Sequence, residues 1–207
     1  MLALALALAL ADAPSPTGGA VALAPPSTPA ATHVEVDRRR VRVQLAGMGV
    51  LTGWAAANLI GGAIGNLVVP VGRDARYFHQ ANWAWNTVNL TLGAIGLRSA
   101  RRERPGAAGP RQVDAAITRA QRVFAVNALL DVGYVVGGYT TWEIGKDRES
   151  ARVRGYGEAV IFQGAFLLAF DLAMILAHET GARRLERAPV LAPIAGPVQG
   201  LALGGRF

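Results

Sequence analysis

Two aspartates each stand alone in a long run of otherwise uncharged residues. Asp131 is the only charged residue between Val123 and Trp142, and Asp171 is the only one between Ala159 and Ala177. An aspartate at the centre of a membrane helix costs about 2.5 to 3.5 kcal/mol on insertion scales, so such residues usually have a partner or a function. A shared proton, a bound cation or hydrogen bonds from nearby amides would each satisfy these carboxyl groups.

A second group of polar residues follows one face of a predicted helix. Asn82, Asn86 and Asn89 are separated by four and then three residues, which places three amides on a face that must look away from lipid. His79 and His178 stand at the ends of their runs, where we expect interfacial histidines. The candidate ligand- or ion-binding residues are Asp131, Asp171, Asn86, Asn89, Asn127, Gln163, Tyr134 and His79.

The polar residues that these helices turn inward, which we call the polar seam, have two interpretations. Hydrogen bonds between membrane helices stabilise helix packing by about 0.6 kcal/mol each on average, so the seam can be a structural core that fixes how the helices pack. It can equally be a binding site. Our leading hypothesis is a non-enzymatic membrane protein with a structural or binding role. The alternative is a proton- or cation-coupled transporter or channel subunit that uses Asp131 and Asp171.

Catalytic motifs are missing from the sequence. We find no His-Glu-x-x-His helix, nucleophile elbow, dinucleotide fingerprint or di-iron Glu-x-x-His pair. The chain has no cysteine, which excludes disulfides and thiolate ligands. We therefore expect no catalytic residues, no metal site and no cofactor.

The elements that carry these residues are apolar helices. Of the 207 residues, 52% are hydrophobic and 17% charged, whereas a soluble domain carries about a quarter charged residues. At 1.5 Å per residue, a run of about 19 residues crosses roughly 30 Å of hydrocarbon. The runs are apolar around most of their circumference, which argues against a soluble bundle. Four such runs lie at about residues 45–69, 78–97, 123–142 and 159–177. The sequence predicts an all-α, multi-pass transmembrane four-helix bundle over residues 41–180.

The basic residues fit a lipid partner. The net charge is +7, but the arginines lie mainly between the apolar runs and form no single basic face with interleaved aromatic residues. We expect the lipid bilayer as partner and no nucleic acid. Arginine and lysine are concentrated on the side that holds both termini, which by the positive-inside rule is cytoplasmic.

Small residues predict how the helices meet. A stripe that advances by four residues lets a second helix approach closely, either within the chain or in a homo-oligomer. The stripe consists of Gly49, Gly53, Ala57, Gly61 and Gly65. Weaker stripes are Gly133 and Gly137 in the third run and Ala165, Ala169, Ala173 and Ala177 in the fourth.

Both ends of the chain have a distinct composition. Residues 1–13 alternate Leu and Ala and end in an A-x-A pattern, which predicts a signal peptide, although the basic n-region is missing and a low-complexity end is the alternative. Residues 14–40 are predicted to be a disordered Pro/Ala-rich linker and residues 181–207 a Pro/Gly-rich tail. A cleaved signal peptide would export the mature N-terminus, against the charge rule, so orientation stays open.

Three stretches resemble a known family. They are Tyr77-Phe78-His79-Gln80 through Trp85-Asn86-Thr87-Val88-Asn89, Asn127 through Leu130-Asp131-Val132-Gly133-Tyr134, and Gly155-Tyr156-Gly157 through Gln163-Gly164 to Phe170-Asp171. The family is an uncharacterised group of small bacterial four-helix membrane proteins with a predicted signal sequence, classed as a domain of unknown function. The resemblance covers about Trp54 to Ala177. It implies a multi-pass protein of the bacterial inner membrane and a signal peptide, but no substrate.

Overall fold

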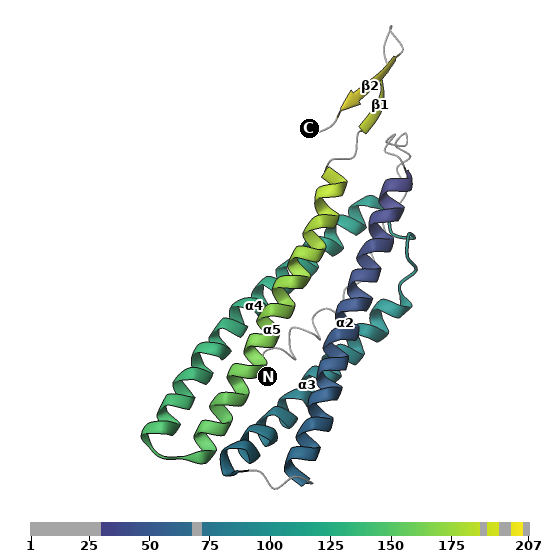
Figure 1. Ribbon diagram of the computed structural model, residues 1–207. Coiled ribbons are helices and arrows are strands. Elements are labelled where there is room, and N and C mark those ends of the chain that lie inside the picture. The colour runs from purple at the N-terminus through teal and green to yellow at the C-terminus, as the bar shows by residue number, and fades with distance from the viewer. Residues whose placement is uncertain (1–29, 68–71, 187–189, 195–199, 205–207) are drawn as a thin grey trace.

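The computed structural model describes residues 30–67, 72–186, 190–194 and 200–204, and within them it is built from four long helices (Figure 1). They are α2 (Ala30–Leu67), α3 (Arg73–Arg102), α4 (Pro110–Asp147) and α5 (Ala151–Glu186). After α5, β1 (Val190–Ile194) and β2 (Gly200–Gly204) pair as an antiparallel hairpin. The predicted all-α four-helix fold is confirmed, with the hairpin as an addition in the tail.

Two predicted boundaries differ from the structure. The linker was expected to reach residue 40, but α2 begins at Ala30, so residues 30–40 are helical and that boundary is wrong. The Pro/Ala-rich composition that predicted the linker ends before this segment, where Val36 and Val41 are buried because the helix turns one face inward. At the other end α5 continues to Glu186. The predicted signal peptide and the first part of the linker lie outside the described residues.

The helices form two antiparallel hairpins, α2 with α3 and α4 with α5 (Figure 1). Helix α5 packs on α2 and α3 as well as on α4. Helices α3 and α4, although consecutive in the chain, hardly pack on each other. The bundle is therefore closed through α5 and splayed between α3 and α4.

Local sequence explains the two ends of α4. At its start the Gly109 N–H donates to the Gln112 side-chain oxygen at 3.0 Å, which satisfies one helix-end amide. At its end Glu149 has a φ of 51°, and the N–H of Ser150 donates to the Gly145 carbonyl at 2.8 Å. This is the geometry of a Schellman motif, and it turns the chain directly into α5.

Glycines let α4 and α5 approach backbone to backbone. A Cβ on Gly157 would lie 2.5 Å from the backbone nitrogen of Trp142, and one on Gly138 would lie 2.8 Å from that of Ile161. Gly145 and Gly164, each seven residues further along, are similarly close to the facing helix. This seam explains why the α4–α5 hairpin is the most extensive contact of the bundle.

The small-residue stripes predicted as packing seams lie mostly elsewhere. A Cβ on Gly49, Gly53 or Gly61 would meet nothing within 4 Å, and Ala57 is exposed. Gly133 and Gly137 of the weaker stripe also face open space. In α5, Ala165, Ala169 and Ala173 are exposed. Only Gly65 of the main stripe is packed, against the His79 ring, so the prediction of an internal seam is wrong for the rest. Small residues occur on both faces of these helices, and their spacing alone does not say which face is inside.

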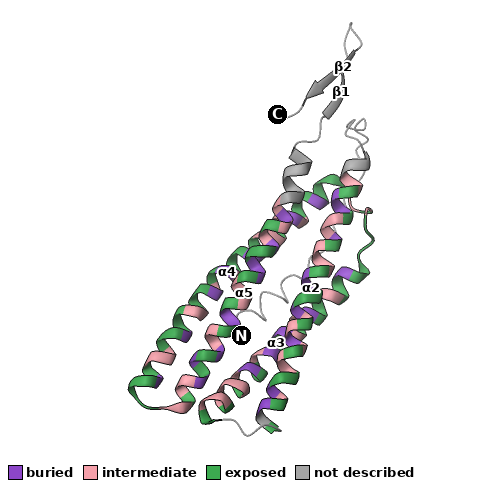
Figure 2. Cartoon of the chain, viewed as in Figure 1, coloured by how far each residue is buried: buried purple, intermediate pink, exposed green. Residues whose placement is uncertain are grey.

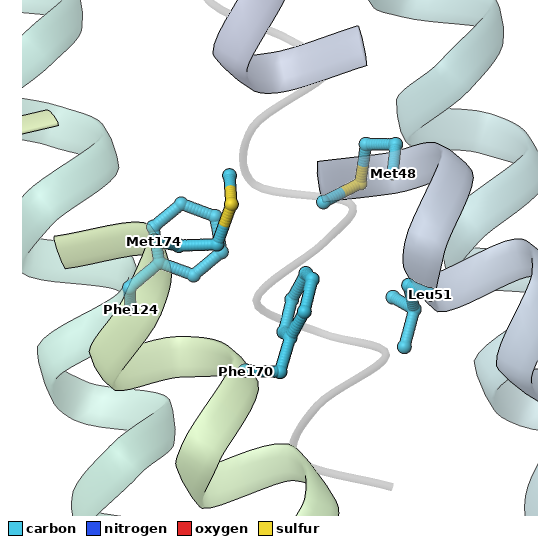
Figure 3. Packing of buried hydrophobic residues seen from close by; sticks show 5 residues of the cluster. All are labelled: Met48, Leu51, Phe124, Phe170 and Met174. Carbon is cyan, nitrogen blue, oxygen red and sulfur yellow. The ribbon is translucent and has the colours of Figure 1, made fainter. Parts of the chain in front are cut away.

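The apolar core lies between α2, α4 and α5. Met48 and Leu51 of α2 point toward Phe124 of α4 and toward Phe170 and Met174 of α5 (Figure 3). The Phe124 and Phe170 rings meet at 78° with centroids 6.2 Å apart, an edge-to-face arrangement. This cluster holds α2 against the α4–α5 hairpin.

The exterior is apolar as well. Buried residues lie where the helices face one another, and exposed residues cover the outside (Figure 2). Many exposed residues are large and hydrophobic, such as Leu67 at 83%, Leu129 at 73% and Leu176 at 62% exposure. Exposed apolar side chains in this number are compatible with contact with lipid.

Three helical stretches are long and apolar enough to cross a membrane by length and composition, namely His33–Gly65, Pro110–Asp147 and Ala151–Glu179. Helix α3, which contains the expected span 78–97, is not among them. Its amides Asn82, Asn86 and Asn89 lower its hydropathy, but all three are buried inside the bundle.

Candidate functional site

The asparagines of α3 form one end of a buried amide cluster. Asn82, Asn86 and Asn89 are at most 4% exposed, as their spacing predicted. The Asn86 amide donates to the Asn82 carbonyl at 2.7 Å and to the Asn82 side-chain oxygen at 3.1 Å. The Asn89 amide in turn donates to Asn86 Oδ1 at 3.4 Å. The three side chains therefore form a chain of hydrogen bonds along α3.

Side chains from α2 and α5 complete this cluster. Asn82 Nδ2 donates to Asn58 Oδ1 of α2 at 2.8 Å. Gln163 of α5 is fully buried and donates to Asn82, while its Oε1 accepts from Asn89 Nδ2 and from Trp54 Nε1, each at 3.3 Å. The cluster thus ties three helices together at one level of the bundle.

The amide cluster is uncharged and satisfied from within. Each of its side-chain amide nitrogens has an acceptor inside the bundle, since that of Asn58 donates to the Trp54 carbonyl at 2.8 Å. Satisfied polar groups of this kind specify how helices pack. The arrangement fits the structural interpretation of the seam for Asn86 and Gln163.

The two isolated aspartates form a separate pair. Asp131 of α4 and Asp171 of α5 are 2% and 4% exposed, and their side chains lie within hydrogen-bonding reach of each other. A hydrogen bond between two carboxyl groups requires a proton on one of them. Asp131 Oδ2 has no hydrogen-bond partner among the described residues. The pair is therefore only partly satisfied, unlike the amide cluster.

The carboxyl pair lines a cleft of about 720 Å³. Most of the lining comes from α3 and α4, the two helices that hardly pack on each other, with a smaller share from α2 and α5. The lining is mainly apolar and includes Leu51, Val88, Leu92, Ile95, Val123, Phe124, Leu130, Leu167 and Phe170. At the end nearest the amide cluster the Trp85 and Tyr134 rings meet edge to face, with centroids 4.9 Å apart.

His178 is a further polar residue in the cleft. It is 2% exposed, lines the cleft and leaves Nε2 without a hydrogen-bond partner within the described residues. It lies seven residues after Asp171, which at 1.5 Å per residue is about 10 Å along the same face of α5. Its ring packs near Phe124, with centroids 5.9 Å apart. The cleft therefore presents two incompletely satisfied polar groups.

The end of the cleft beyond His178 is charged. Arg40, Glu103 and Arg119 line it, and the Arg40 guanidinium bonds both Glu103 and Asp37. Asp37 is fully buried and also accepts the N–H of Gly106 at 2.8 Å. This network fixes the loop between α3 and α4 to α2.

The structure divides the predicted site residues into three places. Asn86 and Gln163 belong to the amide cluster, and Asn89 lies both in that cluster and at the cleft. The cleft holds Asp131, Asp171, Asn127 and Tyr134. His79 is elsewhere: its ring packs on Gly65, and Nδ1 is buried without a partner. It is not brought together with the aspartates.

Sequence reasoning missed two contributors. His178 was assigned to the interface because the last apolar run ends at Ala177, but α5 continues to Glu186 and carries His178 into the cleft. Its seven-residue spacing from Asp171 was the available signal. Trp54 also joins the amide cluster, and its ring stacks on Phe166 with centroids 3.8 Å apart.

Among the described residues, no group of three or more His, Cys, Asp and Glu side chains comes together as possible ligands of a metal ion. Two carboxyls, an imidazole and amides in an apolar cleft supply charge and hydrogen bonds for an organic molecule. Clefts of this size and lining commonly hold small molecules.

Comparison with known proteins identifies a family. The model of a family described as "Family of unknown function (DUF6992)" matches residues 50–172, close to the extent of the predicted resemblance. No curated protein and no solved structure matches the chain.

Proposed function

The chain belongs to the DUF6992 family, whose function is unknown, and from its cleft we propose that it is a membrane protein that binds a small amphiphilic molecule. The observation that supports this proposal is the Asp131–Asp171 pair, whose hydrogen-bonding capacity is incompletely satisfied, in a mainly apolar cleft of about 720 Å³. An amphiphile matches both parts of such a lining. Its apolar body would contact the walls and its polar group the carboxyls.

We place all four helices across the bilayer. Three are apolar enough by composition, and α3 packs against α2 and α5 with its amides turned inward. Outside the cleft, α3 exposes the apolar ring of Trp83. Multi-pass helical bundles are typical of the bacterial inner membrane, because outer-membrane proteins are β-barrels. We therefore propose that this protein lies in a bacterial inner membrane.

The gap between α3 and α4 supports entry from the bilayer. These helices hardly pack on each other, and they supply most of the cleft lining. A molecule dissolved in lipid would reach the carboxyl pair sideways, without passing through water. This route favours an amphiphile over a fully polar solute.

We favour binding over catalysis because the two carboxyls lie together in a cleft whose lining is mainly apolar. The second candidate is proton- or cation-coupled transport by Asp131 and Asp171. The observation in its favour is that two buried carboxyls lie within reach of each other, where they can hold one proton between them. The Trp85 and Tyr134 rings meet between α3 and α4 near the carboxyl pair. This contact favours a binding site over a conduction pathway for protons or cations.

The proposal is tested by native mass spectrometry of the intact protein in mild detergent. We expect the wild-type protein to retain one small molecule per chain. The Leu92→Trp variant should lose it, because the larger side chain fills the cleft. The control variant Leu129→Trp should keep it, because Leu129 is 73% exposed and faces outward. A wild-type protein with no added mass, or a ligand kept by Leu92→Trp, would contradict the proposal. Proton or cation flux into liposomes that Asp171→Asn abolishes, with the protein still folded, would favour the transporter.

A further inference from the structure

The carboxyl pair has no cationic partner within the described part of the chain. The two arginines that line the cleft are Arg40 and Arg119. Arg40 is bonded to Asp37 and Glu103. Arg119 is twelve residues before Asp131 on α4, which at 1.5 Å per residue is about 18 Å away. When the pair holds one proton, its negative charge is therefore uncompensated.

Aromatic side chains line the same cleft as the carboxyl pair. Tyr134 lies one helical turn from Asp131 and meets Trp85, and Phe170 directly precedes Asp171; all three line the cleft. Aromatic faces attract cations, most strongly when the cation is removed from water. Carboxylate and aromatic groups together are a common setting for an ammonium group.

An inorganic cation fits these surroundings less well. Calcium takes six to eight oxygen ligands and magnesium keeps most of its waters. The described residues form no cluster of three or more His, Cys, Asp and Glu side chains. The apolar walls would leave most of a small ion without ligands, whereas they would contact the hydrocarbon part of an organic cation.

We infer that the cleft selects a lipophilic amine, with its ammonium group on Asp131 and Asp171 and its hydrocarbon body between α3 and α4. This inference rests on the proposed function and names its ligand class. His178 Nε2, about 10 Å along α5 from Asp171, offers a second hydrogen-bond position for an amine that carries another polar group. The ligand reaches its site from the lipid phase through the gap between the two helices.

The test measures retention of three radiolabelled probes of equal chain length, decylamine, decanol and decanoate, by the full-length protein in phosphatidylcholine nanodiscs. Empty discs give the background. We expect saturable retention of decylamine, at least tenfold tighter than that of decanol, and no saturable retention of decanoate. The combined Asp131→Asn and Asp171→Asn variant should lose this preference, and Asp114→Asn, an exposed carboxylate on α4, should keep it.

The outcomes separate the inference from the proposed function. Equal retention of decylamine and decanol by the wild-type protein would overturn the amine preference and leave a binding cleft. Saturable retention of radioactive sodium in place of decylamine would overturn it in favour of an inorganic cation. Retention of none of the probes, with no ligand in the native mass spectrum, would overturn both. The wild-type probe series decides the question even if the double variant does not fold.

Discussion

The Asp37 carboxylate on α2 accepts a hydrogen bond of 2.8 Å from the backbone N–H of Gly106, 69 residues further along the chain. Asp37 also bonds the Arg40 guanidinium, at 2.9 Å to Nε and 2.8 Å to Nη2. Gly106 has a φ of 85°, a left-handed conformation that favours glycine. One buried carboxylate thus anchors the only loop that joins the two helical hairpins within the described residues.

Asp37→Ala should destabilise the protein by about 3 kcal/mol, because it leaves the mostly buried Arg40 without its buried carboxylate partner and frees the loop. The measurement is the free energy of unfolding in detergent. Glu143→Ala removes a carboxylate that also pairs with a base three residues away, Lys146, but in solvent. That control should change the free energy by less than about 1 kcal/mol. Similar losses for both variants would contradict the anchoring role.

Gly157→Ala should destabilise the α4–α5 hairpin by about 1 to 3 kcal/mol, because the new methyl group would lie 2.5 Å from the Trp142 nitrogen and backbone atoms cannot move aside. Thermal unfolding followed by circular dichroism measures the effect. Gly137→Ala is the matched control, since its Cβ would meet nothing within 4 Å. It should leave stability unchanged or raise it by up to about 1 kcal/mol, from helix propensity. A neutral Gly157→Ala would show that the seam is looser than described.

Asn82→Ala should cost about 1 to 2 kcal/mol, because Asn58, Asn86 and Gln163 each lose a hydrogen bond to that side chain. Unfolding in detergent by a denaturing surfactant measures the loss. Thr87→Ala serves as control, since its hydroxyl is exposed and donates only to the Trp83 carbonyl one turn back. An Asn82 variant as stable as the Thr87 variant would mean that the amide cluster does not hold α2, α3 and α5 together.

The proposed topology predicts which sites a membrane-impermeant thiol reagent reaches from each side. The chain has no cysteine, so each single-cysteine variant reports one position. Arg73→Cys and Asp147→Cys, at the start of α3 and the end of α4, should label from the same side. Arg111→Cys, at the start of α4, should label from the opposite side. Labelling of all three positions from one side would contradict a four-helix crossing.

Periodicity predicted which face of a helix turns inward but not which residues meet across helices. The four- and three-residue spacing of Asn82, Asn86 and Asn89 correctly marked an inner face of α3. Nothing in the sequence assigned Gln163 and Trp54 as their partners, because the register between helices depends on packing across the whole bundle. The pairing of Asp131 with Asp171 was foreseeable because each was the only charge in its run.

The glycine stripes show the opposite case. The four-residue repeat from Gly49 to Gly61 faces outward, whereas the close contact uses Gly138 and Gly157, which belong to seven-residue repeats shared with Gly145 and Gly164. A repeat of seven follows the inner face of two helices that run side by side, and a repeat of four drifts around the helix. The spacing of the small residues, more than their number, indicated which faces of α4 and α5 pack together.

Helix α3 has a consequence for how the protein is made. Its buried amides keep it from being apolar enough to cross on its own, and they hydrogen-bond one another along α3 as well as Asn58 of α2 and Gln163 of α5. Under the proposed topology, α3 enters the bilayer stably only as a hairpin with α2, and the pair stays incomplete until Gln163 of α5 arrives. In a chain interrupted before α5, Asn89 would lack its partner Gln163, so the amide cluster is complete only once the last helix has packed.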